Sequence, residues 1–152
     1  MGKVKVGING FGRIGRIAFR IGILKHFDEI EYTAINTSGS LGVAGWAHLV
    51  NYDTTYRRFA YEVKATETQK PDQATDDKPQ IGTLLISERN LSVPVLTQRD
   101  PAKIPWSRFG AEVIIESTGK FTSEEEAKKH ALGGTKEWLF LPRPKGGMSA
   151  LL

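Results

Sequence analysis

The chain has 152 residues, of which 39% are hydrophobic, and this is enough to bury the core of a single domain. Its 21 basic and 17 acidic residues give a net charge of +4, and because they are scattered along the sequence they do not predict nucleic-acid binding. The lack of cysteine excludes disulfides, zinc–thiolate sites and a thiol nucleophile within this chain. Apolar runs are far too short to cross a membrane and no signal-peptide pattern is found, so we expect a cytoplasmic protein with no membrane partner.

The first predicted elements are a strand, a glycine-rich turn and a helix. Val4, Val6 and Ile8 alternate with less apolar residues, as in a strand over residues 3–8. After the glycines, apolar residues recur at helical spacing and predict an amphipathic helix whose apolar stripe would face the core. The stripe consists of Ile14, Ile17, Ala18, Ile21 and Leu24, with Arg13, Arg16, Arg20 and Lys25 on the other faces. A second apolar stretch, residues 32–35, completes a strand–helix–strand unit and thereby predicts a parallel sheet.

The later elements are less regular. Residues 41–50 predict a short helix, and the polar, proline-containing residues 67–82 predict a solvent-exposed loop between strands near 58–65 and 83–87. Residues 93–97 and the apolar stretch within 112–118 predict two further strands. Ser123 and Glu126 form a capping box, which indicates a helix that extends to about Leu132. The stretch "EWLFLP", residues 137–142, is apolar enough to add one more strand.

Gly10, Gly12 and Gly15 fit the pattern G-x-G-x-x-G between the first strand and the helix, and this context is typical of dinucleotide-binding domains. Gly10 would allow a sharp turn, Gly12 would let backbone N–H groups approach a pyrophosphate, and Gly15 would let the helix pack closely on the strand. The pyrophosphate would lie at the helix N-terminus, where free N–H groups and the helix dipole favour an anion. The sequence thus predicts an α/β domain of the Rossmann type, doubly wound, with a mostly parallel sheet and helices on both faces.

The end of the second strand leaves the choice of cofactor open. In NAD-binding domains a carboxylate about twenty residues after the glycines binds the ribose 2′-hydroxyl. Here the strand ends in Asn36, Thr37 and Ser38, followed by Ser40, and no acid is present. Hydroxyl groups could donate to the 2′-phosphate of NADP, or Thr37 could bind the ribose of NAD. Because this stretch has no arginine to hold a phosphate, the sequence does not predict a strong preference for NADP.

Five stretches, in order, resemble the phosphorylating glyceraldehyde-3-phosphate dehydrogenases. They are "VGINGFGRIGR", "AINTSG", "HLVNYDTTYRRF", "QRDPAKIPW" and "VIIESTGKFTSEEEAKKHALGGTK". The resemblance covers residues 3–136 apart from the loop around 67–82, which is longer than usual in the family. It implies an oxidoreductase of glucose metabolism that oxidises and phosphorylates an aldehyde and transfers a hydride to NAD or NADP.

The resemblance also implies which residues bind the cofactor. The residues that match Arg13 and Ile14 contact the diphosphate in the family, and the position of Thr37 usually carries an aspartate. Arg99 matches a residue beside the adenine. A turn beneath the cofactor matches residues 117–119, although helix-entry chemistry ahead of Ser123 is the simpler interpretation of these hydroxyls from the sequence alone. The expected set is Asn9, Gly10, Phe11, Gly12, Arg13, Ile14, Gly15, Asn36, Thr37, Arg99, Ser117, Thr118, Gly119 and Phe121.

Other polar residues give no sign of a site. His26, His48 and His130 lack the spacing of metal ligands, so we expect surface or internally hydrogen-bonded histidines and no metal. Asp53 and Asp100 fit turn positions. The three tryptophans are predicted to be packing residues, because no interleaved basic–aromatic pattern accompanies them.

Residues 137–152 depart from the family, which continues with a valine-rich strand and S-A-P. Here the sequence is "EWLFLPRPKGGMSALL". Reading these codons one nucleotide earlier turns Trp138, always encoded by TGG, into Val or Met followed by Val, and the later codons permit the family-like "VVISAPAKGG". We therefore expect residues 1–136 to form an NAD(P)-binding domain and residues 137–152 to be a non-family tail from a one-nucleotide frameshift near Lys136, with the catalytic domain absent.

The family's chemistry needs a cysteine, which forms a covalent thiohemiacetal and is activated by a histidine. This chain contains no cysteine, so we expect it to bind cofactor but to be inactive alone, and its assembly into the family's homotetramer is open. Two alternatives remain at this stage. One is a non-enzymatic NAD(P)-binding or interaction module, and the other is a fragment of an erythrose-4-phosphate dehydrogenase, which shares the cofactor motifs.

Overall fold

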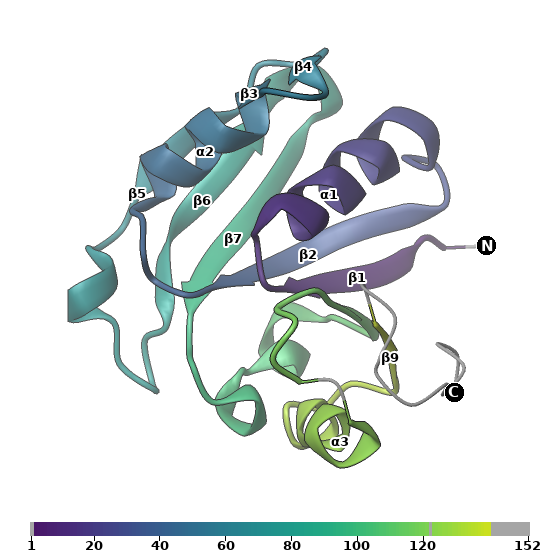
Figure 1. Cartoon of the computed structure of the whole chain (residues 1–152), viewed down its shortest axis with the longest axis vertical. Coiled ribbons are helices and arrows are strands. Elements are labelled where there is room, and N and C mark those ends of the chain that lie inside the picture. Colours follow the sequence, from purple (N-terminus) through teal and green to yellow (C-terminus); the bar gives the residue numbers. More distant parts are fainter. Residues whose placement is uncertain (1, 122, 141–152) are drawn as a thin grey trace.

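A computed structural model of the chain describes residues 2–121 and 123–140, and these residues contain a seven-stranded sheet of order β5-β6-β7-β2-β1-β8-β9 (Figure 1). Five strands pair in parallel, and they are β1 (Val4–Asn9), β2 (Ile30–Thr37), β7 (Leu91–Thr97), β8 (Val113–Glu116) and, at one edge, β9 (Glu137–Phe140). At the other edge, β6 (Gln80–Ile86) and β5 (Lys64–Glu67) are antiparallel to their neighbours. The predicted mostly parallel sheet is confirmed.

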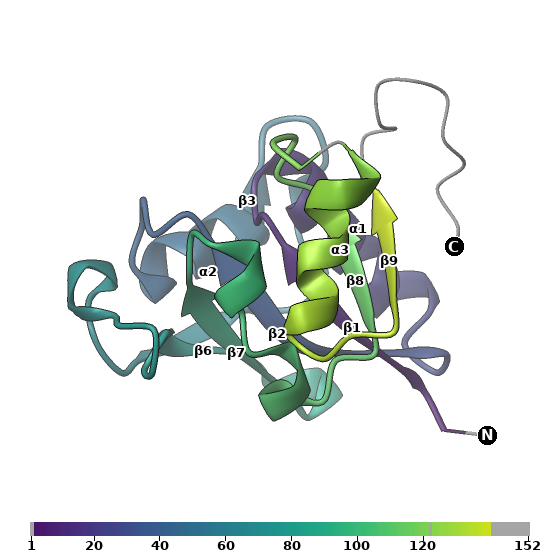
Figure 2. The same cartoon turned by 90° about the horizontal axis from the view of Figure 1, so that it is seen from below.

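The helices lie on both faces of this sheet, as a doubly wound fold requires. Helix α1 (Arg13–Lys25) connects β1 to β2, and α2 (Val43–Asn51) lies beside it on the same face (Figure 1). Helix α3 (Glu124–Leu132) lies on the opposite face (Figure 2), together with the 3-10 turns at residues 101–103 and 106–109. No helix in the described ranges is long and apolar enough to cross a membrane.

Two hydrophobic cores form, because successive strand residues point to opposite faces of the sheet. On β2, Ile35 belongs to the core under α1 and α2, whereas the preceding residue Ala34 belongs to the second core. Trp106 is fully buried at the centre of this second core, and the partly buried Trp138 of β9 packs against it. Phe11 and Trp46 lie 5.9 Å apart, centroid to centroid, in the first core. The tryptophans are therefore packing residues, as predicted.

The buried face of α1 is not the one that the isoleucine spacing predicts. Phe19 and Ile23 are buried, whereas Ile14, Ile21 and Leu24 are 43%, 45% and 44% exposed. The reason is close packing, because the face that turns inward carries two glycines. A Cβ at Gly15 would collide with the Gly10 carbonyl oxygen, and one at Gly22 would collide with the Tyr32 hydroxyl. Only a face without side chains at these two positions can lie so near the sheet.

Arg20 also departs from the prediction, which placed it on a face away from the core. The residue is only 6% exposed, and its Nη2 donates to the Arg57 carbonyl oxygen over 2.8 Å. Arg57 lies in a small two-stranded ribbon, in which β3 (Tyr52–Asp53) pairs with β4 (Arg57–Arg58). The strand predicted near residues 58–65 is thus wrong over most of its length, since residues 59–63 connect this ribbon to β5.

The remaining predicted elements are confirmed with small shifts of their ends. Helix α2 covers the helix expected at residues 41–50, and the loop expected at 67–82 runs from residue 68 to 79 with one 3-10 turn at Pro71–Gln73. At the start of α3, the Ser123 hydroxyl accepts a hydrogen bond from the Glu126 amide, and the Glu126 carboxylate accepts one from the Ser123 amide. The strand expected at residues 137–142 is present as β9, and residues 141–142 lie outside the described residues.

Candidate dinucleotide site

A cleft of about 600 Å³ opens where the carboxyl ends of β1, β2 and β8 meet. This is the edge at which ligands bind in open α/β sheets. The lining residues are Asn9, Gly10, Phe11, Gly12, Asn36, Thr37, Ser38, Ser40, Trp46, Gln98, Arg99, Ser117, Thr118, Lys120 and Phe121. Ten of the fourteen residues expected from the sequence are therefore gathered around one cleft, although some of them are more than a hundred residues apart in the chain.

The glycine loop fits a pyrophosphate by its shape. Gly10 has φ +95°, and a Cβ there would lie 2.7 Å from the Thr118 amide nitrogen, so the turn can accommodate only glycine. Gly12 is different, because its φ is an ordinary −71° and no atom lies within 4 Å of a Cβ built there. The protein itself therefore does not need glycine at position 12. The open space at Gly12 lies at the cleft wall, where the glycine pattern predicts that a pyrophosphate approaches the backbone.

The N-terminus of α1 offers hydrogen-bond donors at this wall. Gly12 is the N-cap residue, and no side chain caps the helix. The first turn contains no acidic residue, so no carboxylate of that turn competes with a ligand for the N–H groups of Arg13 and Ile14. The side chains of Arg13 and Ile14 are exposed and do not line the cleft, and Gly15 is buried beneath it. A contact of these three residues with a cofactor would thus be made by the backbone.

Arg16 fixes the loop from below. Its Nη1 donates to the Phe11 carbonyl oxygen over 3.0 Å, and burial lowers the pKa of its guanidinium. Phe11 is 1% exposed and stands edge-on to Phe19, with ring centroids 5.6 Å apart. The glycine loop therefore has glycines at its surface and a buried aromatic anchor beneath them.

The end of β2 presents hydroxyl groups to the cleft. Thr37 is buried, and its hydroxyl donates to the Leu96 carbonyl oxygen over 3.0 Å and accepts from the Gly39 amide. Ser38 and Ser40 are exposed and hydrogen-bonded to each other over 3.0 Å. The hydroxyl proton of Thr37 is thus already used within the protein, so the serines are better placed to hydrogen-bond a ribose or a phosphate.

The opposite wall is the turn after β8. The Ser117 hydroxyl donates to the Gly10 carbonyl oxygen over 2.7 Å, which joins this turn directly to the glycine loop. Gly119 has φ +71° and lies in the turn without lining the cleft, whereas Phe121 lines it and stands edge-on to the His130 ring. The Ser117 hydroxyl thus makes a long-range contact and is more than a helix-entry residue ahead of Ser123, whereas the Thr118 hydroxyl bonds locally to Glu116 and Lys120.

Two residues that the sequence analysis did not single out also line the cleft, Gln98 and Lys120. Gln98 directly follows β7, and the rule that ligands gather at the carboxyl ends of strands could have identified it. Lys120 and Arg99 are the cations of the cleft, and no acidic residue is found among the described residues that line it. The lining is therefore suited to an anionic ligand.

The loop of residues 68–79 braces the Gln98 side of the cleft. Asp76 accepts hydrogen bonds from Lys103 Nζ over 2.8 Å and from Gln98 Nε2 over 2.7 Å. These contacts with Lys103 and Gln98 lower the pKa of the Asp76 carboxyl. The loop is exposed, as predicted, but it is tied at this point to a residue of the cleft.

The polar residues that the sequence assigned to structure do have structural roles. The Asp53 carboxylate accepts from the amides of Tyr56 and Thr55, and these hydrogen bonds lower its pKa. Asp100 accepts from the Ala102 amide at the start of a 3-10 turn. His130 is fully buried and hydrogen-bonded. In the part of the chain that the structure describes, no group of three or more potential ligands could hold a metal ion.

Comparison with known proteins agrees with this site. Residues 4–124 match the family described as glyceraldehyde 3-phosphate dehydrogenase, NAD binding domain. A glyceraldehyde-3-phosphate dehydrogenase of Streptomyces coelicolor is 42% identical over 136 residues, which is 90% of this chain and 35% of that protein. Glyceraldehyde-3-phosphate dehydrogenase 1 of Bacillus cereus is 38% identical over 92% of this chain and 36% of its own length.

A cytosolic glyceraldehyde-3-phosphate dehydrogenase of the plant Craterostigma plantagineum is 36% identical over 90% of this chain and 36% of its own length. The chain thus spans about a third of the length of the curated relatives that it matches. The family match covers the glycine loop, the ends of β2 and β7 and the turn after β8, which are the parts that form the cleft. The chain belongs to the NAD-binding domain family of the glyceraldehyde-3-phosphate dehydrogenases.

Proposed function

We propose that this chain is the cofactor-binding part of a phosphorylating glyceraldehyde-3-phosphate dehydrogenase and that it holds NAD or NADP in the cleft. The observation that carries the proposal is the open space at Gly12, beside an uncapped helix N-terminus and the φ +95° turn of Gly10. When bound, the nicotinamide ring supplies a hydride acceptor for the oxidation of an aldehyde. The residues of this chain bind and orient the cofactor for that reaction.

Each wall of the cleft has its own part in the proposal. The backbone from Asn9 to Gly15 holds the diphosphate. The space for the adenosine ribose is lined by Asn36 and Thr37 together with the two serines that follow. Arg99 lies on the adenine side. The turn of Ser117, Thr118 and Gly119, with Phe121, supports the nicotinamide side. In this arrangement the two ends of the cofactor rest on the ends of different strands, so the sheet fixes their separation.

The chemical step needs groups that this chain does not carry. The family's mechanism uses a cysteine thiolate, and the chain contains no cysteine. We therefore propose that the chain alone binds cofactor without oxidising the aldehyde, and that any homotetramer depends on the catalytic domain found in the family.

Calorimetric titration of the purified, folded chain with NAD tests the proposed function. We expect saturable binding at one site, weaker than in an intact dehydrogenase, because in the family the catalytic domain contributes to the nicotinamide side of the cofactor site. ADP-ribose, which lacks the nicotinamide, should bind about as well as NAD for the same reason. A folded chain that binds neither compound, or one that binds NAD as tightly as an intact enzyme, contradicts the proposal.

The choice between NAD and NADP gives a second measurable expectation. With no carboxylate at the cleft, NADP should bind within about tenfold of NAD, a difference of about 1.4 kcal/mol or less. Replacing Ser38 with aspartate (Ser38→Asp) should lower the affinity for NADP more than that for NAD, because it sets a negative charge at the exposed rim near the 2′-phosphate. Titrations of both variants, Ser38→Asp and Thr37→Asp, with both cofactors check this. An unchanged affinity ratio in both would show that the end of β2 does not face the 2′ position.

We further propose that residues 1–136 are the family's domain and that residues 137–152 derive from a one-nucleotide frameshift near Lys136. The support is the next-frame sequence "VVISAPAKGG", which resembles the family where the printed frame does not. Sequencing the genomic locus beyond codon 152 should show family-like codons in the shifted frame. A continuous open frame with no such codons downstream would refute the frameshift.

A further inference from the structure

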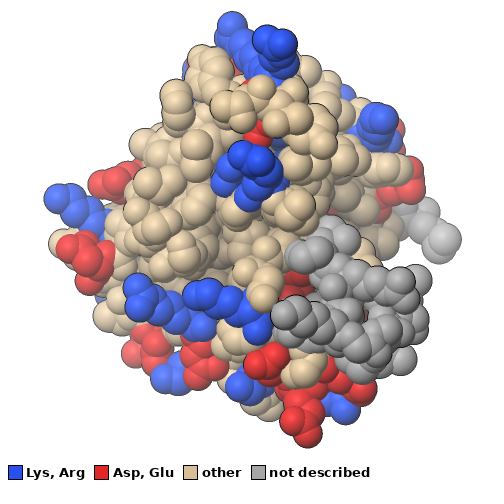
Figure 3. All heavy atoms as spheres, viewed as in Figure 1, with Lys and Arg blue, Asp and Glu red and all other residues tan. Residues whose placement is uncertain are grey.

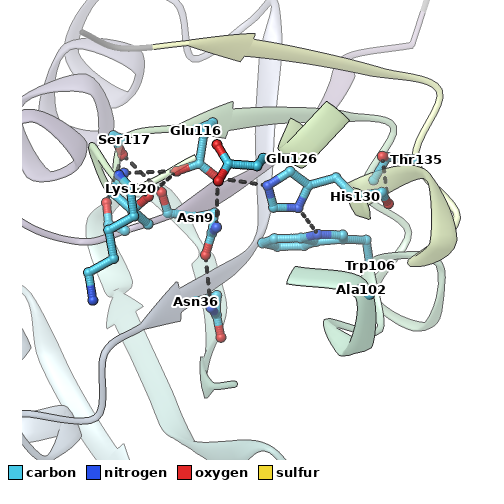
Figure 4. A network of polar contacts seen from close by, with 12 residues as sticks. Asn9, Asn36, Ala102, Trp106, Glu116, Ser117, Lys120, Glu126, His130 and Thr135 are labelled. Carbon is cyan, nitrogen blue, oxygen red and sulfur yellow. Dashed lines mark hydrogen bonds and ion pairs between the residues drawn. The ribbon is translucent and has the colours of Figure 1, made fainter. Parts of the chain in front are cut away.

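Glu116, the last residue of β8, is the centre of a buried network that reaches the cleft (Figure 4). The side chain is 1% exposed. Its Oε2 accepts a hydrogen bond from Asn9 Nδ2 over 2.7 Å and contacts His130 Nε2 at 2.7 Å. Its Oε1 accepts from the Thr118 amide over 2.9 Å and from the Thr118 hydroxyl over 2.5 Å. One carboxylate thus contacts β1, the turn after β8 and helix α3 at once.

The direction of the hydrogen bond between His130 and Glu116 follows from a third residue, Trp106. The indole Nε1 of a tryptophan can only donate, and Trp106 Nε1 donates to His130 Nδ1 over 3.1 Å. His130 Nδ1 must therefore be without a proton, so the proton of the neutral ring is on Nε2 and is donated to Glu116. The four groups that hydrogen-bond to the Glu116 carboxyl can therefore all donate, and both of its oxygens act as acceptors.

The same network fixes the orientation of two asparagine amides in the cleft lining. Because Asn9 donates a hydrogen bond from Nδ2 to Glu116, its Oδ1 faces β2 and accepts a hydrogen bond from Asn36 Nδ2 over 2.8 Å. Asn36 in turn donates to the Gln98 carbonyl oxygen over 2.8 Å and accepts from the Gln98 amide over 2.9 Å. The ends of β1, β2 and β7 are thereby joined in one ordered chain of hydrogen bonds that begins at the Glu116 carboxylate.

Thr118 connects the network to the glycine loop. Its backbone nitrogen and methyl group lie 2.7 and 2.8 Å from the position that a Cβ on Gly10 would occupy. A shift of Thr118 would therefore move one wall of the cleft against the other. We propose that Glu116 is a positioning residue of the dinucleotide site, whose carboxylate holds Thr118 and Asn9 in the arrangement that binds the cofactor. This inference rests on the proposed function of the cleft.

The substitution Glu116→Gln keeps the shape of the side chain and removes its charge and part of its capacity to accept hydrogen bonds. Whichever carboxylate oxygen the glutamine NH2 group replaces, it would face groups that themselves donate a hydrogen bond. His130 cannot relieve the conflict by moving its proton to Nδ1, because Trp106 Nε1–H already points there. We expect Glu116→Gln to weaken NAD binding by about tenfold or more, since an unmade buried hydrogen bond is costly and here it displaces the cleft wall.

The experiment compares NAD affinities measured by calorimetry at a temperature where every variant is folded. Glu112→Gln is the matched control, because Glu112 precedes the same strand, is exposed and lies at the end far from the cleft. It should bind NAD within about twofold of the parent chain. If the parent chain binds NAD and Glu116→Gln binds it equally well, the positioning role is overturned while the proposed function stands. If the folded parent does not bind NAD, the proposed function falls, and the positioning role with it.

A double-mutant cycle gives a readout that general destabilisation does not produce. In a Trp106→Phe background the donor to Nδ1 is gone, so His130 is free to change tautomer and accept from a glutamine at position 116. The effect of Glu116→Gln on NAD affinity should then be smaller than in the parent background but not abolished, because Asn9 Nδ2 still donates toward the same position. Nitrogen NMR of His130 should also show the proton on Nε2 in the parent chain. A proton on Nδ1, or an equal effect of Glu116→Gln in both backgrounds, contradicts the inference.

Discussion

Valine at position 12 should remove dinucleotide binding and leave the fold intact. Gly12 has φ −71° and ψ −163°, which valine adopts readily, and no atom lies within 4 Å of its missing Cβ. The branched side chain would instead enter the cleft, where the pyrophosphate must approach the N–H groups of α1. We expect Gly12→Val to lower NAD affinity by at least about 100-fold, or about 2.7 kcal/mol. Calorimetry measures the affinity, and circular dichroism checks that the sheet and helices are unchanged.

Gly42 provides a matched control for this substitution. It is the N-cap residue of α2, with φ −70° and ψ 167°, and it does not line the cleft. Gly42→Val and Gly12→Val should therefore share the same small loss of helix capping, and their thermal midpoints should agree within about 4 °C. Gly42→Val should bind NAD normally. If both variants bind NAD as the parent does, the cleft does not hold the diphosphate at Gly12.

Much of the fold could be predicted because local signals and topology agree. Apolar residues alternate in β1 and recur at helical spacing in α1, with glycines between the two elements. A strand followed by such a crossover helix predicts a parallel partner strand, and β1 and β2 do pair in parallel. The capping box of Ser123 and Glu126 placed the start of α3 to within one residue. The cleft was predicted for the same reason, since the glycine pattern between a strand and a helix leaves room for an anion at the helix N-terminus.

The parts that could not be predicted depend on contacts between distant residues. Within the buried strand β8, nothing local indicates that Glu116 is held by Asn9, which is 107 residues away, and by His130. The ribbon at residues 52–58 consists of two-residue strands, too short for any periodicity to show. Lys120 reaches the cleft only because the sheet brings the end of β8 to the same edge as the ends of β1 and β2.

Helix α1 shows how a sequence signal can be present and still be misinterpreted. Its two faces are both apolar, and the isoleucine spacing is the more regular of the two. The face that packs is the one with Gly15 and Gly22, seven residues apart and therefore on the same side of the helix. Small residues at this spacing indicate close approach to the sheet, and they outweigh the larger apolar area of the isoleucines. The isoleucine face therefore points away from the sheet.

That outward face forms an apolar stripe on α1, made of Ile14, Ile17, Ile21 and Leu24. Three of the four side chains are more than 40% exposed, and Ile17 is half-buried. Figure 3 shows a broad area with few charged side chains on the face that α1 and α2 cover, with one basic group near its middle and other charges around its margin. Exposed apolar patches favour association between molecules, because each buried side chain of this size contributes about 1.5–3 kcal/mol. The stripe should therefore draw molecules of this chain together.

We expect the purified chain to self-associate at micromolar concentration and the double substitution Ile21→Lys with Leu24→Lys to weaken this association by at least about tenfold, or about 1.4 kcal/mol. Both side chains point away from the core, so the thermal midpoint should change little. Sedimentation over a range of concentrations measures the association of each variant. Leu132→Lys is the control, because Leu132 is 75% exposed but lies on α3, across the sheet from the stripe. If Leu132→Lys reduces association as strongly as the double substitution, or if the parent chain stays monomeric at high micromolar concentration, the stripe on α1 is not what brings the molecules together.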